Sequence, residues 1–157
     1  MKPPWTLTGS MALLWSQRGA LMLVHYESSP VGPYDEWARG VLTRQGPRIV
    51  EMLVTSEDSR RSGRENWGFP KQLAALCWKQ REGRIEFQSE SRMYRFRACG
   101  PRFPLSSKGF CVQTLNGQDV RVPLKIKGQA RLAWRGRQVA LLVENFVFHV
   151  DWPEPIK

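Results

Sequence analysis

Short apolar or alternating runs, separated by turn residues at near-regular intervals, fill most of this chain and restrict it to a strand-rich fold. The strongest hairpin signal is Asn116-Gly117, which lies between two such runs. The expected strands are 5–15, 20–27, 34–43, 48–55, 72–79, 84–89, 92–99, 110–115, 118–122, 125–134 and 138–150, and 100–109 is expected to be an irregular cavity rim. This spacing predicts a mainly β (β-dominated α+β) domain closed into a barrel or cone.

Helix signals occur in one place. Thr55 is followed three residues later by Asp58 in the manner of a capping box, and Glu57 and Asp58 put negative charge in a first helical turn. Gly63 is the residue at which we expect this helix to end. We therefore expect one short helix over about residues 56–62.

Length and composition are those of one globular domain, 1–157, able to bury a core of its own. The apolar stretch from Met11 to Val24 is broken by a polar turn at residues 16–19, so it is too short for a membrane helix. Only Lys2 precedes Pro3-Pro4, and no small-residue cleavage site follows, which does not match a secretory signal. The expected compartment is cytoplasmic.

Cysteine and histidine are sparse. The three cysteines have neither C-x-x-C spacing nor histidines at ligand spacing, and the two histidines lie in strand-like runs. A disulfide framework, a zinc site and a Ser-His-Asp triad therefore lack support, and no Gly-rich phosphate loop is present. We expect no metal and no organic cofactor.

The net charge of +10 favours an anionic partner without saying which kind. A basic β barrel with exposed aromatic residues can bind single-stranded nucleic acid, and Trp5, Trp37, Trp134 and the Arg92-x-x-Arg95-x-Arg97 run would serve that purpose. The basic residues are scattered, however, and most tryptophans lie in core-like runs. Acidic surfaces and small carboxylates qualify as well, and the predominance of arginine also suits bidentate carboxylate binding.

Residues 62–74 combine charged, aromatic, Gly and Pro residues in a way that predicts a loop entering a strand. Pro70 fixes its own φ and favours extended geometry at Phe69, so Lys71 is held stiffly. The apolar run 73–78 follows and is typical of a buried strand. A lysine at a rigid strand start, directed inwards, is a candidate nucleophile.

The run from Gly63 to Lys71, Gly-Arg-Glu-Asn-x-Gly-x-Pro-Lys, resembles the signature of the acetoacetate decarboxylase family. The resemblance implies that Lys71 forms a Schiff base with a small keto acid. Upstream, Gly32-Pro33-Tyr34-x-Glu36 resembles the family's other cavity-lining stretch, with Glu36 as its carboxylate. The family's second lysine is replaced by Gln72. The family also commonly assembles, so we expect a homo-oligomer.

An imine-forming lysine must attack as the neutral amine, and from a pKa of about 10.4 its deprotonation at pH 7 costs about 4.6 kcal/mol. Burial and neighbouring cations lower that pKa. Acetoacetate decarboxylase is itself a known example of this activation. Here Gln72 supplies no charge, and on a strand it would face away from Lys71, so activation is expected from Leu73, Ala75 and nearby arginines.

Arg64 could lower the lysine pKa or bind a substrate carboxylate, with Glu65 holding it in place, and Glu36 could move protons. The predicted site is therefore catalytic Lys71 and Glu36 with Arg64, Glu65 and Gln72 as substrate-binding residues.

The leading function is a Schiff-base lyase for a small keto acid. The alternatives are a non-catalytic binder that holds an anionic or apolar ligand through Arg64, and the nucleic-acid barrel.

Overall fold

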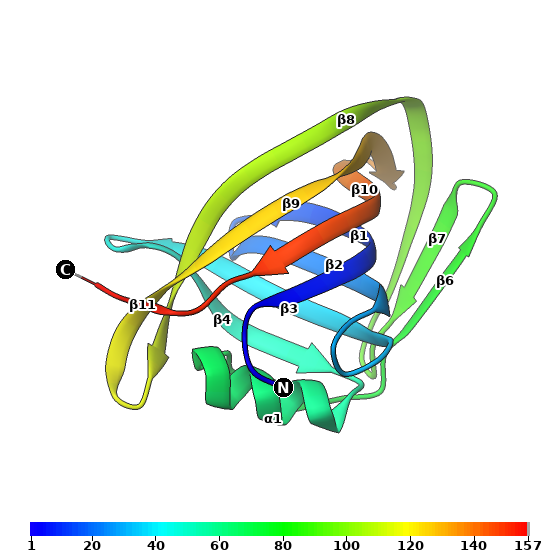
Figure 1. The fold of residues 1–157 in the computed structure, drawn as a ribbon. Helices are drawn as coiled ribbons and strands as arrows, with labels where there is room; N and C mark the ends of the chain where they lie inside the picture. The colour runs from blue at the N-terminus through cyan, green and yellow to red at the C-terminus, as the bar shows by residue number, and fades with distance from the viewer. Residues whose placement is uncertain (157) are drawn as a thin grey trace.

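One sheet holds all the strands of the computed structural model, which describes residues 1–156 (Figure 1). Its order is β5-β4-β3-β2-β1-β10-β9-β8-β7-β6, with β11 paired to β9. The elements are β1 (Trp5–Ser16), β2 (Gly19–Ser28), β3 (Tyr34–Thr43), β4 (Gly46–Val54), α1 (Glu57–Trp67), β5 (Lys71–Leu73), β6 (Cys77–Arg81), β7 (Arg84–Gln88), β8 (Met93–Leu115), β9 (Gln118–Arg135), β10 (Gln138–Val150) and β11 (Glu154–Pro155). The mainly β class with one helix is confirmed.

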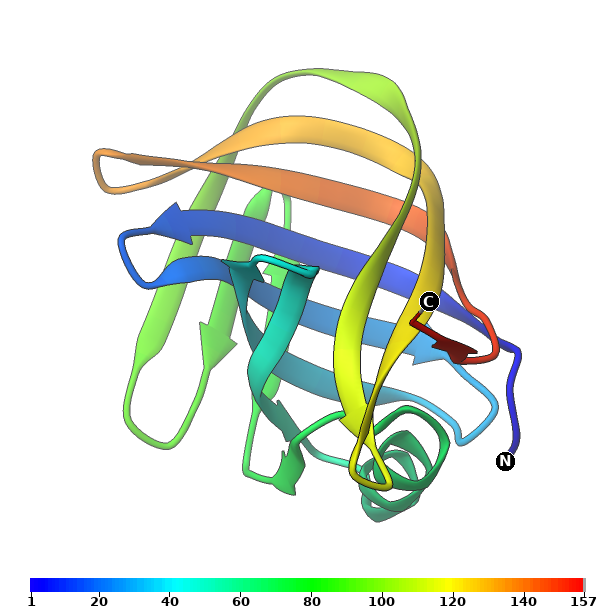
Figure 2. The same ribbon diagram turned by 90° about the vertical axis from the view of Figure 1, so that its left-hand side faces the viewer.

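The two faces of the sheet support two separate cores. Along β1, Leu7 and Met11 belong to a core on the concave face, whereas Ala12 and Leu14 belong to a core on the opposite face, because side chains alternate along a strand. The second core is covered by β6, β7 and the first part of β8, which fold back behind β1 and β2 (Figure 2). The chain thus forms a curved sheet with a second β layer over part of its outer face.

Strand β8 is longer than the sequence indicated. Residues 100–109 lie within it, so the expected irregular rim is wrong. Gly100 (φ +73°) and a register shift between Cys99 and Phe103 bend the strand without ending it. Its first residues pair with β7, and from Phe103 it pairs with β9 alone, leaving a free edge that tolerates Pro104.

Helix α1 begins and ends differently from the prediction. Ser56 is the N-cap, and its side chain accepts the Ser59 N–H. The helix continues through Gly63 to Trp67 and ends at Gly68, which adopts a left-handed conformation (φ +74°). The first half of the expected loop 62–74 is therefore helical. The strand that follows, β5, has three residues and is therefore shorter than expected. Its Leu73 is 53% exposed, so this strand is also not fully buried.

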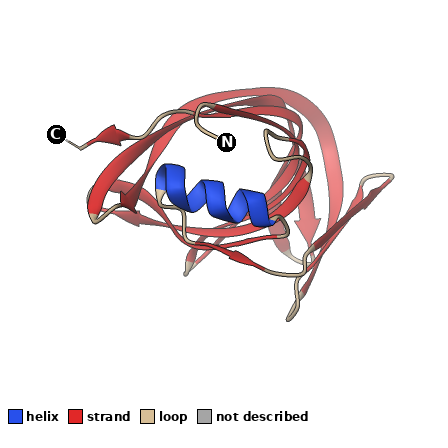
Figure 3. Cartoon of the chain, turned by 60° about the horizontal axis from the view of Figure 1, so that its bottom comes forward, coloured by secondary structure: helices blue, strands red, loops and turns tan. Residues whose placement is uncertain are grey.

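The curved sheet is not closed, which corrects the expected closed barrel or cone. Its hydrogen-bonded path ends at β5 and β6, and no pairing among residues 1–156 joins them. On the concave side, β4 approaches β8 through Arg48, which bonds Thr114 (3.1 Å) and the carboxylate of Asp119 (3.2 Å). Helix α1 lies across the opening at one end (Figure 3). Within the described residues no helix is long and apolar enough to cross a membrane.

Candidate functional site

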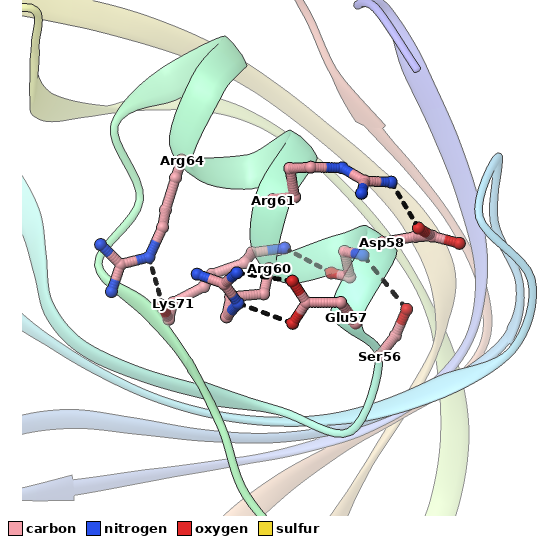
Figure 4. Close-up of polar contacts among 8 residues, drawn as sticks. Ser56, Glu57, Asp58, Arg60, Arg61, Arg64 and Lys71 are labelled. Atoms are coloured by element: carbon pink, nitrogen blue, oxygen red, sulfur yellow. Dashed lines mark hydrogen bonds and ion pairs between the residues drawn. The ribbon is translucent and has the colours of Figure 1, made fainter.

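Lys71 lies where the chain leaves α1 and joins the sheet. It pairs in parallel with Met52 of β4, and its side chain is only 4% exposed. Its carbonyl oxygen accepts a hydrogen bond from Nε of Arg64 (2.6 Å), as Figure 4 shows. Main-chain pairing and the arginine thus fix the backbone from which the lysine side chain enters the protein.

Helix α1 provides both the space and a hydrogen-bond partner for the Lys71 side chain. A Cβ added at Gly63 would lie 2.6 Å from Cδ and 2.7 Å from Cε of the lysine, so only glycine leaves room for it. One turn earlier, the Ser59 hydroxyl accepts a hydrogen bond from Lys71 Nζ at 2.9 Å. Ser59 and Gly63 are four residues apart and therefore share one helix face.

Three aromatic rings surround the ammonium end of Lys71. Nζ lies 5.8 Å from the ring centroid of Trp5, 5.4 Å from that of Tyr34 and 5.9 Å from that of Phe69. These distances allow cation–π attraction while the rings exclude water. The lysine head is therefore held in an apolar enclosure and not in solvent.

Glu36 is the second ionisable group of the site. It is 4% exposed on β3, and its Oε2 lies 3.5 Å from Lys71 Nζ. Its Oε1 accepts a hydrogen bond from the Tyr26 hydroxyl at 3.3 Å. Strands β2 and β3 place these two side chains on the same face because Tyr26 pairs with Tyr34, two residues from Glu36.

Burial shifts the pKa of each group in the direction that favours its neutral form. The pKa of Lys71 is lowered by desolvation, and the Glu36 carboxylate opposes this shift. The pKa of Glu36 is raised by desolvation, and Lys71 and the Tyr26 hydroxyl oppose that shift. Both shifts reduce the cost of forming a neutral amine beside a protonated carboxyl, which is the state in which a lysine attacks a carbonyl group next to a proton donor.

A cavity of about 100 Å³ surrounds the two groups. Its ionisable lining residues are Lys71, Glu36, Tyr26, Tyr34 and Cys111, and the remainder is apolar or tryptophan. Nothing in residues 1–156 forms a group of three or more His, Cys, Asp or Glu side chains able to hold a metal ion.

The other expected site residues lie elsewhere. Arg64, Glu65 and Gln72 are exposed, and none of them lines the cavity. Lys71 faces inwards and Gln72 outwards, as strand alternation predicted. Leu73 and Ala75 are also exposed, so the expectation that they desolvate the lysine is wrong, and Trp5, Tyr34 and Phe69 do so instead.

Sequence reasoning missed Ser59, Tyr26 and Trp5, which complete the site. Ser59 would have been found had the helix been extended to Gly63, because the spacing puts both residues opposite Lys71. Tyr26 and Trp5 carry no local signal, since only the pairing of β1, β2 and β3 brings them to Lys71 and Glu36.

Comparison with known proteins identifies the family of this chain. The family model "Acetoacetate decarboxylase (ADC)" matches residues 9–97, more than half of the chain and the part that carries Glu36, Ser59 and Lys71. The chain belongs to the acetoacetate decarboxylase family. No curated protein sequence matches it significantly.

Two solved structures share the fold of this family member. Acetoacetate decarboxylase from Legionella pneumophila superposes with a TM-score of 0.60 at 12% identity, covering 98% of this chain and 85% of that one. A second acetoacetate decarboxylase structure gives a TM-score of 0.54 at 9% identity, covering 97% and 88%. At these identities the likeness shows the fold alone.

Proposed function

We propose that Lys71 forms an imine with the carbonyl group of a small substrate and that the protein uses this imine for carbon–carbon chemistry, as a Schiff-base lyase. The observation that carries the proposal is a single buried lysine whose pKa is lowered, 3.5 Å from a buried carboxyl whose pKa is raised, inside one cavity. Lysines are rarely fully buried unless paired, and the partner of Lys71 is itself a group whose charged form is disfavoured by burial.

The chemistry can be written with these two groups. The neutral amine attacks the carbonyl carbon, protonated Glu36 gives its proton to the oxygen, and one proton of the amine nitrogen also passes to that oxygen, which leaves as water while the C=N bond forms. The resulting iminium accepts an electron pair from a neighbouring bond, either the bond to a carboxylate that leaves as carbon dioxide or another carbon–carbon or carbon–hydrogen bond. The enamine is then protonated at carbon, and water releases the product and the lysine.

The neighbouring residues support these steps. Ser59 accepts a hydrogen bond from Nζ and thereby directs the amine, while Tyr26 donates to Glu36 and positions its carboxyl. Arg64 acts as a positioning residue through the Lys71 carbonyl. Its exposed guanidinium, with Glu65 and Gln72, could meet an anionic substrate only outside the cavity.

Trapping by reduction tests the proposal. The protein is incubated with cyanoborohydride and each of a panel of small keto acids, ketones and aldehydes, and adducts are located by intact mass and peptide mapping. We expect one adduct, on Lys71, which disappears in Lys71→Ala and persists in the matched control Lys79→Ala, an exposed lysine on β6. An adduct that survives Lys71→Ala, or none with any member of the panel, would contradict it.

A non-catalytic binder is the second candidate, favoured by the predominantly apolar lining of the cavity. Ligand binding in the cavity without any trapped adduct would support it. The nucleic-acid alternative loses one of its stacking residues, because Trp5 is buried in the cavity wall.

A further inference from the structure

Among residues 1–156, Lys71 is the one basic side chain that lines the cavity, and its amine is already partnered. Nζ of Lys71 donates to Ser59 and lies beside Glu36. The other ionisable lining side chains, two tyrosines and Cys111, remain uncharged because burial raises their pKa values, to about 11 for the cysteine. No arginine or histidine lines the cavity, although the chain has a net charge of +10. The other basic side chains thus lie outside the cavity.

A substrate carboxylate would be poorly accommodated there. A buried charge needs a partner and hydrogen bonds to replace its hydration. Here the carboxylate would compete with Glu36 for the one cation and meet its negative charge whenever Glu36 is ionised. Arg64, the expected carboxylate ligand, is exposed and bonded to the main chain.

The rest of the lining suits a small apolar substituent. Met11, Met22 and Met52 contribute flexible thioether side chains, which adapt to differently shaped apolar groups. A protein cavity of about 150 Å³ is known to take up benzene, so about 100 Å³ accommodates a smaller molecule. The cavity therefore suits a ligand that is both small and apolar.

We infer that the Lys71 site selects a small neutral aldehyde or ketone with an apolar substituent over a keto acid of the same size. This rests on the imine chemistry proposed above. Without a carboxylate to lose, the iminium of a simple ketone can lose an α proton. The α C–H bond breaks, its proton goes to the Glu36 carboxylate, and its electron pair forms the enamine C=C bond as the iminium nitrogen becomes neutral. In D₂O the α position then takes up deuterium.

A matched pair of probes tests the selection. Pyruvate and 3-methylbutan-2-one have the same number of non-hydrogen atoms and similar shapes, but only pyruvate carries a charge. The rate of cyanoborohydride trapping on Lys71 is measured for each and divided by its rate with Nα-acetyl-lysine, which removes the intrinsic reactivity difference. We expect the corrected rate for the ketone to exceed that for pyruvate by about tenfold or more. Deuterium uptake into the ketone should require Lys71.

Adding a cation to the cavity should reverse the preference. Met22→Arg places a guanidinium on the lining, and Met22→Gln is its neutral polar control. We expect the corrected pyruvate rate to rise relative to the ketone in the arginine variant only. A corrected pyruvate rate equal to or above that of the ketone in the parent protein overturns the inference and leaves the imine proposal intact. Absence of a Lys71 adduct with both probes overturns the inference, and absence with every member of the panel overturns the imine proposal as well.

Discussion

Lys71 and Glu36 experience two opposing electrostatic effects. Their mutual attraction favours the ion pair, whereas loss of hydration disfavours each charge. For both groups the pKa shift has the sign set by burial, so desolvation outweighs attraction. The same enclosure that excludes water therefore favours the neutral form of each group.

Glu36→Gln should shift the pH dependence of imine formation to lower pH. The Glu36 carboxylate raises the pKa of Lys71, so its removal leaves desolvation unopposed and lowers that pKa further. More neutral amine is then present at a given pH, by about tenfold per unit of displacement until the profile levels. The measurement is the trapping rate on Lys71 as a function of pH. The rising limb should move to lower pH in the variant, although its plateau falls because the proton donor is lost.

Gln72→Lys is the matched control for this experiment. A second lysine next to Lys71 would lower its pKa only if both amines shared the cavity, and β5 directs residue 72 to solvent. Its pH profile should therefore overlay that of the parent protein. A profile displaced in Gln72→Lys but not in Glu36→Gln would show that exposed charge, and not the buried carboxyl, controls the lysine.

Sequence reasoning named Lys71 and Glu36, which the structure brings together, but not their surroundings. Lys71 follows a local Pro-Lys motif, and Glu36 was named through the family resemblance of residues 32–36. The partner of Lys71 was misassigned, because Arg64 is near it in sequence yet contacts only its main chain. The groups that set the lysine pKa come from β1, β3 and α1, and no local pattern records which strands become neighbours.

At the scale of elements, α1 brings one face of small residues against the lysine. The helix extends beyond Gly63 because that glycine has a helical conformation, whereas Gly68 has the left-handed φ that ends helices. The two glycines cannot be distinguished from sequence by residue type. Gly63 is retained in the helix interior, where glycine is unfavourable, because its missing side chain makes room for Lys71.

Gly63→Ala should therefore lower the reactivity of Lys71 and change the stability of the protein little. Alanine favours the helix by up to about 1 kcal/mol over glycine, which offsets part of the cost of the close contact. The new methyl group must displace Cδ and Cε of Lys71, and misplacement of a reacting group by about 1 Å can cost on the order of a hundredfold in rate. We expect trapping on Lys71 to fall to that extent while the thermal unfolding midpoint changes little.

Glu65→Ala, at an exposed position of the same helix, is the control and should keep the parent trapping rate. An unchanged rate in Gly63→Ala would mean that the lysine adapts without loss. A folded Gly63→Ala protein is required for the comparison, and the unfolding midpoint establishes it.

At the scale of the whole molecule, the mainly β class followed from sequence, but the extents of several strands and their assembly did not. The expected strands 118–122 and 125–134 are one strand, β9, and the expected strand 72–79 is divided between β5 and β6. Hairpins are local, so runs such as 138–150 were bounded correctly. The return of β6 and β7 over the outer face depends on the bend in β8 near Gly100, where Gly and Pro suggested a loop. An open sheet with a second layer and a closed barrel present the same alternating pattern along each strand.

The expected homo-oligomer is better argued from a face of the sheet than from its edges. The edge strands are protected, since β5 has three residues and β6 carries Lys79 and Arg81. Trp134 pairs with Val139, and both are 45% exposed. On the adjoining strand β1, Trp15 is 59% exposed and its carbonyl oxygen accepts a bond from Gln138. These three side chains form an apolar strip of the kind that protein partners cover.

We therefore predict self-association through the strip of Trp15, Trp134 and Val139. Light scattering should give the parent protein a mass that is a multiple of 18.1 kDa, and the double variant Trp15→Ser with Trp134→Ser should approach 18.1 kDa itself. Leu73→Ser is the control, because Leu73 is exposed on the edge strand β5, four strands from β1 in the sheet order, and its replacement should leave the mass unchanged. A parent mass of 18.1 kDa would refute self-association, and an oligomer that survives the double substitution would place its interface elsewhere.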